Sequence, residues 1–280
     1  MALELKELSD ALPDGNAPPP TQTTSNTPSV VLFLGDGDFS FAAAHAELYP
    51  EDRLHVTEVL TEQKWQDTFR NTTRRRADLE YAGSTIKFCV SAIDTDLVQH
   101  KDIIYFMFPF IERDREGTVA LVHDAMANIL KKATLETKVY LGLATQKEGT
   151  QCVAYQYGSV PAEQLVLDCI VQSLLVEGTQ CLVLLRVLPA RAFDQYKARG
   201  YAHSLTYNGS KNHALWTKND QTAFCLVVQS KPSSKHERLE IAQTALAMLK
   251  EHCRIYSDRE DARVPERALR PLDGADSDSD

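Results

Sequence analysis

The residues best suited to chemistry in this sequence are two glycines and two aspartates that alternate directly after an apolar run, Gly35-Asp36-Gly37-Asp38. Glycine tolerates a positive φ and lets a ligand approach the backbone, as in nucleotide-binding turns between a strand and a helix. Two carboxylates beside such a turn repel a pyrophosphate and attract a cation. The turn therefore suits the sulfonium nucleoside S-adenosylmethionine better than a dinucleotide; the alternative is a glycine turn without a cofactor.

A third carboxylate, Glu58, stands at the end of the second apolar run. It follows Gly37 at about the 20-residue separation at which an acidic residue of nucleotide-binding folds meets ribose hydroxyls. We predict that Glu58 is a ribose ligand. The alternative is a solvated carboxylate at a strand end.

Alternating strand and helix patterns must position these residues. Apolar runs predict a strand that begins at Val30 and others at 54–60, 86–90, 102–110, 138–143, 181–188 and 223–229; helices are expected at 41–48, 65–80, 118–130, from Pro161, and at 237–256. The run at 102–110 lacks alternation, which is typical of a central parallel strand buried on both faces. The pattern predicts an α/β, Rossmann-like fold: a mainly parallel seven-stranded sheet with helices on both faces and a late antiparallel strand.

Composition divides the chain into four parts. Residues 1–27 are rich in Pro, Thr and Ser and are expected to be a flexible arm. Residues 28–230 carry the strand and helix patterns and form one domain, and 231–258 form a C-terminal helical extension that docks on it or binds a protein partner. Residues 259–280 are expected to be an acidic, disordered tail.

The net charge of −9 argues against a protein that wraps nucleic acid through its overall field. A local basic run, Arg74-Arg75-Arg76 with Arg70 nearby, could still contact RNA, or it could be a solvated helix face. The six cysteines and eight histidines show no metal-ligand spacing, so no metal is expected and the thiols are predicted to be buried. No signal peptide or membrane-length apolar stretch is found, so we expect a soluble chain that is not secreted.

The run Gly35-Asp36-Gly37-Asp38-Phe39-Ser40-Phe41 resembles the signature that opens the family of large-subunit ribosomal RNA (uridine-N3)-methyltransferase-like domains. The resemblance implies a methyltransferase fold, S-adenosylmethionine bound at Gly35 to Ser40, an RNA substrate, and a place in the nucleolus or cytoplasm. It also implies that Asp94 faces the adenine amino group. Asp94 could equally cap the turn before Leu97.

A second resemblance lies at 102–110, where the family pattern reads Asp-x-Ile-x-Phe-Asn-Phe-Pro-His. Pro109 makes the chain rigid there, and Phe108 or Phe110 could stack on a base. Met107 stands where the family has Asn, and Phe110 where it has His. The polar groups that could position a uracil edge are therefore absent.

A third resemblance is Gly200-Tyr201-Ala202-His203, similar to a Gly-Tyr-x-His segment of the family. Methylation of a ring nitrogen requires a proton to leave, so a general base is expected, and His203 and Asp38 are candidates. Two functions stay open: an S-adenosylmethionine-dependent RNA methyltransferase, and a non-catalytic Rossmann-like scaffold or a methyltransferase for a small molecule or protein. The carboxylate turn favours the enzyme, whereas Met107 and Phe110 favour the others.

Overall fold

The computed structural model describes residues 27–70, 72–109, 111, 114–146, 160–188, 190–202 and 219–252. The strands are β1 (Val30–Phe33), β2 (Arg53–Thr57), β3 (Thr85–Lys87), β4 (Ile103–Met107), β5 (Lys138–Gln146), β6 (Gln180–Leu188) and β7 (Asn219–Ser230). The helices are α2 (Ser40–Leu48), α3 (Glu62–Thr68), α4 (Thr73–Tyr81), α5 (Arg115–Lys132), α6 (Ala162–Leu175), α7 (Asp194–Ala198) and α9 (Lys235–His252), with 3-10 turns η1 (Asp96–Val98) and η2 (Ala190–Phe193).

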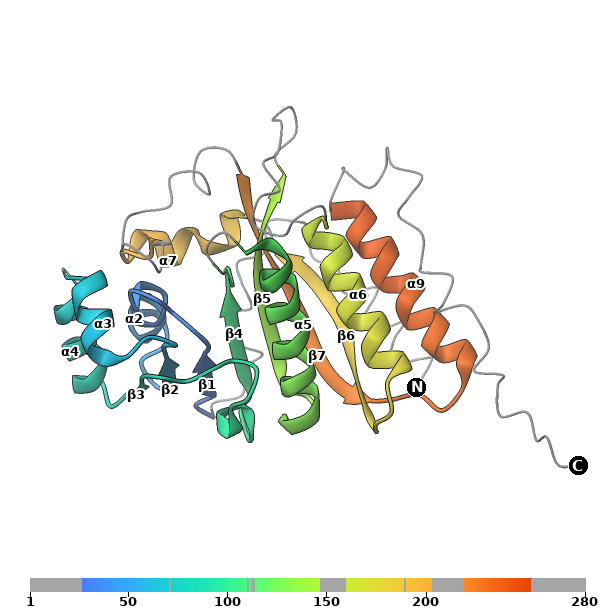
Figure 1. Ribbon diagram of the computed structural model, residues 1–280, viewed down its shortest axis with the longest axis horizontal. Coiled ribbons are helices and arrows are strands. Elements are labelled where there is room, and N and C mark those ends of the chain that lie inside the picture. Colours follow the sequence, from blue (N-terminus) through green and yellow to red (C-terminus); the bar gives the residue numbers. More distant parts are fainter. Residues whose placement is uncertain are drawn as a thin grey trace, which may run out of the picture.

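All seven of these strands form one sheet in the order β3-β2-β1-β4-β5-β7-β6 (Figure 1). The first five in chain order pair in parallel, and β7 is antiparallel to both of its neighbours. The predicted mainly parallel seven-stranded sheet and its late antiparallel strand are confirmed. The strand order reverses beside β1, which places the switch point, where such sheets bind ligands, at the carboxyl ends of β1 and β4.

Helices cover both faces of the sheet because successive side chains of a strand point to opposite sides. Val31 and Phe33 of β1 pack on one face with α2, α3, α4 and α7. Leu32 packs on the other face with α5, α6 and α9, which lie side by side in Figure 1. In β4, Ile104 and Tyr105 are buried on opposite faces, which confirms the predicted central strand.

Some predicted boundaries were wrong for local reasons. The helix expected at 65–80 is two helices, because the hydroxyl and the amide of Thr72 both donate to the carbonyl of Phe69 and close a turn between α3 and α4. Strand β2 ends at Thr57, since the next carboxylate, Glu58, accepts from the amides of Val59 and Leu60. Pro161 is the N-cap of α6 and precedes its first helical residue.

The C-terminal helix α9 docks on the domain. Ala242, Ala245 and Leu249 are buried in the core shared with α6 and β6. The predicted tail (259–280) and the predicted arm (1–27, residue 27 aside) lie outside the described residues. Across the described ranges no helix is long and apolar enough to cross a membrane, and no cluster of three His, Cys, Asp or Glu side chains could hold a metal ion.

The cysteines fit the prediction of buried thiols in part. Cys169, Cys181 and Cys225 are buried, and the desolvation raises the pKa of each thiol. Cys89 is exposed because it leaves β3 in a surface loop, so the prediction was wrong there. Residues 152 and 253 lie outside the described part of the chain.

Candidate functional site

The glycine turn joins β1 to α2 at the carboxyl edge of the sheet. Gly35 has a φ of 63°, which is the positive φ that the sequence predicts, and Gly37 also has a positive φ, of 59°. Phe39, an L-residue, also has a left-handed φ of 60°, at a cost of about 1–2 kcal/mol. Its ring stacks on Trp65 with 4.7 Å between centroids, and this buried contact holds the strained residue in place.

Trp65 fixes the turn from α3. It is fully buried, and its indole Nε1 donates to the carbonyl of Gly37 at 2.6 Å. Its role in the turn was not predicted from the sequence. The available signal was a single tryptophan in an otherwise polar helix.

Glu58 lies inside the turn. Its side chain accepts from the amides of Gly37 (2.9 Å), Val59 (2.9 Å) and Leu60 (3.1 Å), and the residue is 1% exposed. Burial raises the pKa of Glu58, while these amide donors oppose the rise. The structure thus shows Glu58 as a support of the turn, and its role as a ribose ligand stays a prediction.

The two aspartates of the turn have different partners. Asp36 accepts from the amide of Ala42 at 2.8 Å and so caps the first turn of α2. Desolvation, with the charges of Asp38 and Glu58 adding to it, holds the pKa of Asp36 well above its usual range. Asp38 is buried, accepts from the amide of Ser40 at 3.0 Å and forms an ion pair with Arg75 at 2.8 Å.

The segment after α7 reaches the same turn. The hydroxyl of Ser40 donates to the carbonyl of Ala202 at 3.1 Å and lies 3.2 Å from the Ala202 amide. Tyr201 is buried against Phe41, with 4.9 Å between ring centroids. His203, the candidate base, follows Ala202 in the chain and lies outside the described residues.

The residues that follow β4 and were predicted to stack on a base are buried where the structure describes them. Phe108 is only 4% exposed, has a φ of 56°, and donates its amide to the carbonyl of Gly142 at 2.8 Å. The structure thus shows Phe108 as a buried residue, and its role in stacking on a base stays a prediction. Pro109 is also buried, Met107 packs against Gly142, and Phe110 lies outside the described residues.

Asp94 is not brought to the turn. Its carboxylate is 89% exposed and pairs at 3.5 Å with Lys132, the last residue of α5. Helix α5 begins after the carboxyl end of β4 and runs back along the sheet, so Lys132 lies toward the opposite edge (Figure 1). The turn before Leu97 is capped by the hydroxyl of Thr95 and not by Asp94. Asp94 therefore does not cap this turn, and its contact with the adenine amino group stays a prediction.

The three arginine side chains of the basic run in α4 lie in three different environments. The side chain of Arg74 is 93% exposed, with Asp78 at 3.8 Å. Arg75 points into the turn toward Asp38. Arg76 pairs with Glu62 and Glu80 and lies 5.3 Å from the ring centroid of Phe88. Of the three guanidinium groups, that of Arg74 faces the solvent most openly.

Residues 32–204 match the family model described as rRNA (uridine-N3-)-methyltransferase BTM5-like. The comparison with curated proteins gives no match. The matched residues include the glycine turn, Glu58, the end of β4 and the segment at 200–203.

Several of the similar solved structures are methyltransferases of low sequence identity. An O-methyltransferase from a trans-AT PKS multienzyme of Brevibacillus brevis, in complex with S-adenosyl-L-homocysteine, is 17% identical with a TM-score of 0.47, covering 78% of this chain and 72% of that one. The 16S rRNA (adenine(1408)-N(1))-methyltransferase of Catenulisporales acidiphilia is 13% identical with a TM-score of 0.43, covering 74% and 90%. At such scores the likeness is distant, and the strand order of this chain establishes its fold.

Proposed function

The chain belongs to the BMT5-like family of rRNA (uridine-N3-)-methyltransferases, and we propose that it uses S-adenosylmethionine to methylate a uridine at N3 in large-subunit rRNA. The observation that carries the proposal is the turn itself: Asp36, Asp38 and Glu58 gather around two glycines at the switch point of the sheet. A sulfonium and an ammonium group suit this charge, and a pyrophosphate does not.

The turn also offers room for a cofactor. Gly35 is exposed, and no heavy atom lies within 4 Å of the place where a Cβ would stand. We propose that the cofactor contacts the turn from Gly35 to Ser40 on this open side. Glu58 remains the proposed ribose ligand, because a carboxylate has about four acceptor positions and three amides use Glu58 here. Asp94 would have to leave Lys132 to reach the adenine.

When bound, S-adenosylmethionine supplies an electrophilic methyl group, and the N3 proton of the uracil ring must pass to a base. Asp38 and His203 remain the proposed bases. In the described arrangement Asp38 is buried and its carboxylate is engaged by Arg75 and by the Ser40 amide, so His203 is the better candidate of the two.

For the RNA we propose contacts through Arg74 and Phe110. Arg74 is exposed on α4, beside the helix residue that holds Asp38. Phe110 and Phe108 are the aromatic candidates after the end of β4, and Phe108 is buried in the described arrangement. An enzyme of this kind would act in the nucleolus or cytoplasm.

A scaffold that has lost catalysis is the second candidate. Met107 packs on Gly142 in place of a polar side chain, and the Gly37 amide is bound by the protein's own Glu58. Both observations favour a protein that keeps the turn for structural reasons.

Calorimetry tests the cofactor. S-adenosylmethionine should bind more tightly than NAD, Gly37→Arg should abolish the binding, and Glu58→Ala should weaken it. Gly83→Arg is the matched control, because Gly83 also has a positive φ but lies after α4, away from the turn. Preferential binding of NAD would overturn the cofactor proposal.

Mass spectrometry of rRNA nucleosides tests the reaction. Cells without the protein should lack a 3-methyluridine that the wild type restores and Gly37→Arg does not. Unchanged nucleosides together with no cofactor binding would support the scaffold.

A further inference from the structure

Arg75 connects two parts of the site that are far apart in the sequence. Its Nη1 donates to Asp38 Oδ2 at 2.8 Å, and its Nη2 donates to the carbonyl of Gly200 at 3.5 Å. One guanidinium group from α4 thus touches both the glycine turn and the segment after α7. The planar fork of arginine suits this task because its donors can address two acceptors at once.

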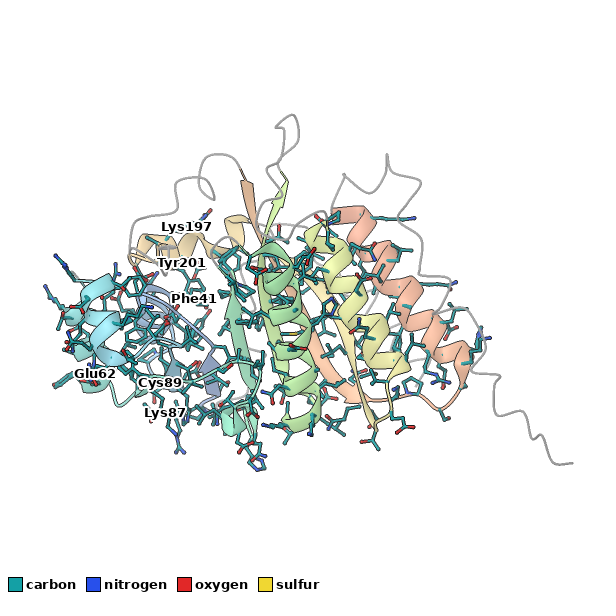
Figure 2. The ribbon with its side chains drawn as sticks, in the orientation of Figure 1. Phe41, Glu62, Lys87, Cys89, Lys197 and Tyr201 are labelled. Carbon is teal, nitrogen blue, oxygen red and sulfur yellow. The ribbon has the colours of Figure 1, made fainter. Side chains whose placement is uncertain are left out.

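The segment 200–202 is fastened to the turn at two further points. Ser40, the first residue of α2, bonds Ala202 through its hydroxyl. Tyr201 is buried beside Phe41, and Figure 2 shows these two labelled side chains as neighbours. Each residue from 200 to 202 therefore contacts the turn, α2 or α4.

Asp38 links these contacts, because both Ser40 and Arg75 donate to its side chain. One of its oxygens accepts from the Ser40 amide and the other from Arg75, while its side chain is only 8% exposed. A buried carboxylate that loses its cation is strongly destabilised, so the ion pair constrains both the turn and α4. The constraint passes through Ser40 to Ala202.

We propose that Arg75 is a positioning residue that fastens segment 200–202 to the glycine turn and so holds this segment beside the proposed methyl-donor site. The proposal rests on the proposed function and deepens it. It removes Arg75 from the set of RNA contacts that the basic run suggested. Methyl transfer depends on the alignment of the methyl donor with the acceptor atom. A shift of segment 200–202, which we call the strap, therefore lowers the rate of the chemical step.

Two substitutions separate the effect of the positive charge of Arg75 from the effect of its hydrogen bonds to both Asp38 and Gly200. Arg75→Lys keeps a cation for Asp38, but its single ammonium group cannot reproduce the two-way fork. Arg75→Met removes both contacts. Arg74→Met, one residue earlier on the same helix, removes an equal charge from a side chain that is 93% exposed and lies 3.8 Å from Asp78 of the same helix.

Hydrogen exchange of the full chain tests the strap without cofactor or RNA. The amide of Ala202 should exchange about tenfold faster in Arg75→Lys and Arg75→Met, as expected for the loss of one charge-assisted hydrogen bond. Arg74→Met should leave this rate within about twofold of the wild type. Unchanged exchange in both Arg75 variants, or equal acceleration in Arg74→Met, would overturn the proposal.

Kinetics with S-adenosylmethionine and rRNA give the second readout. Arg75→Lys should lower kcat about tenfold and leave KM for the cofactor within about twofold. An unchanged kcat with a raised KM for RNA would make Arg75 an RNA contact and reject the positioning role. If the wild type itself methylates no RNA, the proposed function fails, while hydrogen exchange still decides whether Arg75 fastens the strap.

Discussion

At the scale of single residues, the charge of the turn sets the first expectation. Asp36 lies beside Asp38 and Glu58, and desolvation is the main cause of its raised pKa. A raised folded pKa means that the native state holds the proton more tightly than the unfolded chain does. The free energy of unfolding therefore falls as pH rises from the ordinary aspartate pKa, about 3.9, through the folded pKa.

Asp36→Asn should stabilise the protein at neutral pH, because asparagine keeps an oxygen for the Ala42 amide and carries no charge. The gain should be smallest below about pH 4 and grow as pH rises through the window of the raised pKa. Urea unfolding over a pH series measures it. Asp38→Asn is the contrasting variant: it loses the ion pair with Arg75 and should destabilise at neutral pH. A gain from Asp36→Asn that shrinks with rising pH would contradict the explanation.

Some of the site could be predicted from residue types alone. The positive φ of Gly35 follows from the glycine pattern. The left-handed Phe39 could not be predicted, because aromatic residues rarely adopt that φ and its stabilisation comes from Trp65, a contact made only after folding. The pairing of Arg75 with Asp38 could not be predicted either, because it forms only in the folded protein. A run of arginines does not show which of them points inward.

At the scale of elements, helix α3 holds the glycine turn in place through one side chain, that of Trp65. Trp65→Phe keeps an aromatic ring for Phe39 but leaves the buried carbonyl of Gly37 without its indole donor. We expect a loss of about 1–3 kcal/mol in the free energy of unfolding and weaker binding of S-adenosylmethionine. Denaturant unfolding and calorimetry measure the two effects.

The control for this prediction is Gln66→Ala on the neighbouring exposed position of α3, which should change both quantities little. Full cofactor affinity in Trp65→Phe would show that the Gly37 carbonyl does not depend on α3 for its place.

Strands were easier to predict than helix ends. The unbroken apolar run around Ile104 and Tyr105 identified the central strand because a strand buried on both faces has no polar positions. The break between α3 and α4 depends on the hydrogen bonds of Thr72 to Phe69, and local side-chain bonding of this kind competes with a helix without changing its apolar pattern. The ion pair of Asp94 with Lys132 could not be predicted, because it follows from the path of the chain to η1 and α5.

At the scale of the whole molecule, a net charge of −9 has to be reconciled with an RNA substrate. Affinity for RNA comes largely from phosphates neutralised by Lys and Arg, and each contact adds roughly 0.7 to the salt slope for a single strand. Of the basic run, Arg75 and Arg76 are already paired with carboxylates, so Arg74 is the member best exposed to add such a contact. We expect weak autonomous binding of RNA with a shallow dependence on salt.

Arg74→Met should reduce the slope of log K against log salt by about 0.7, measured by fluorescence anisotropy with a labelled single-stranded rRNA fragment. Arg76→Met is the matched control: it removes the same charge from the same helix, but Glu62 and Glu80 hold that guanidinium away from a phosphate. The slope should therefore change little in Arg76→Met. Equal changes of the salt slope in the two variants would mean that RNA responds to the overall charge of the protein. The exposed face of α4 would then not be a specific RNA contact.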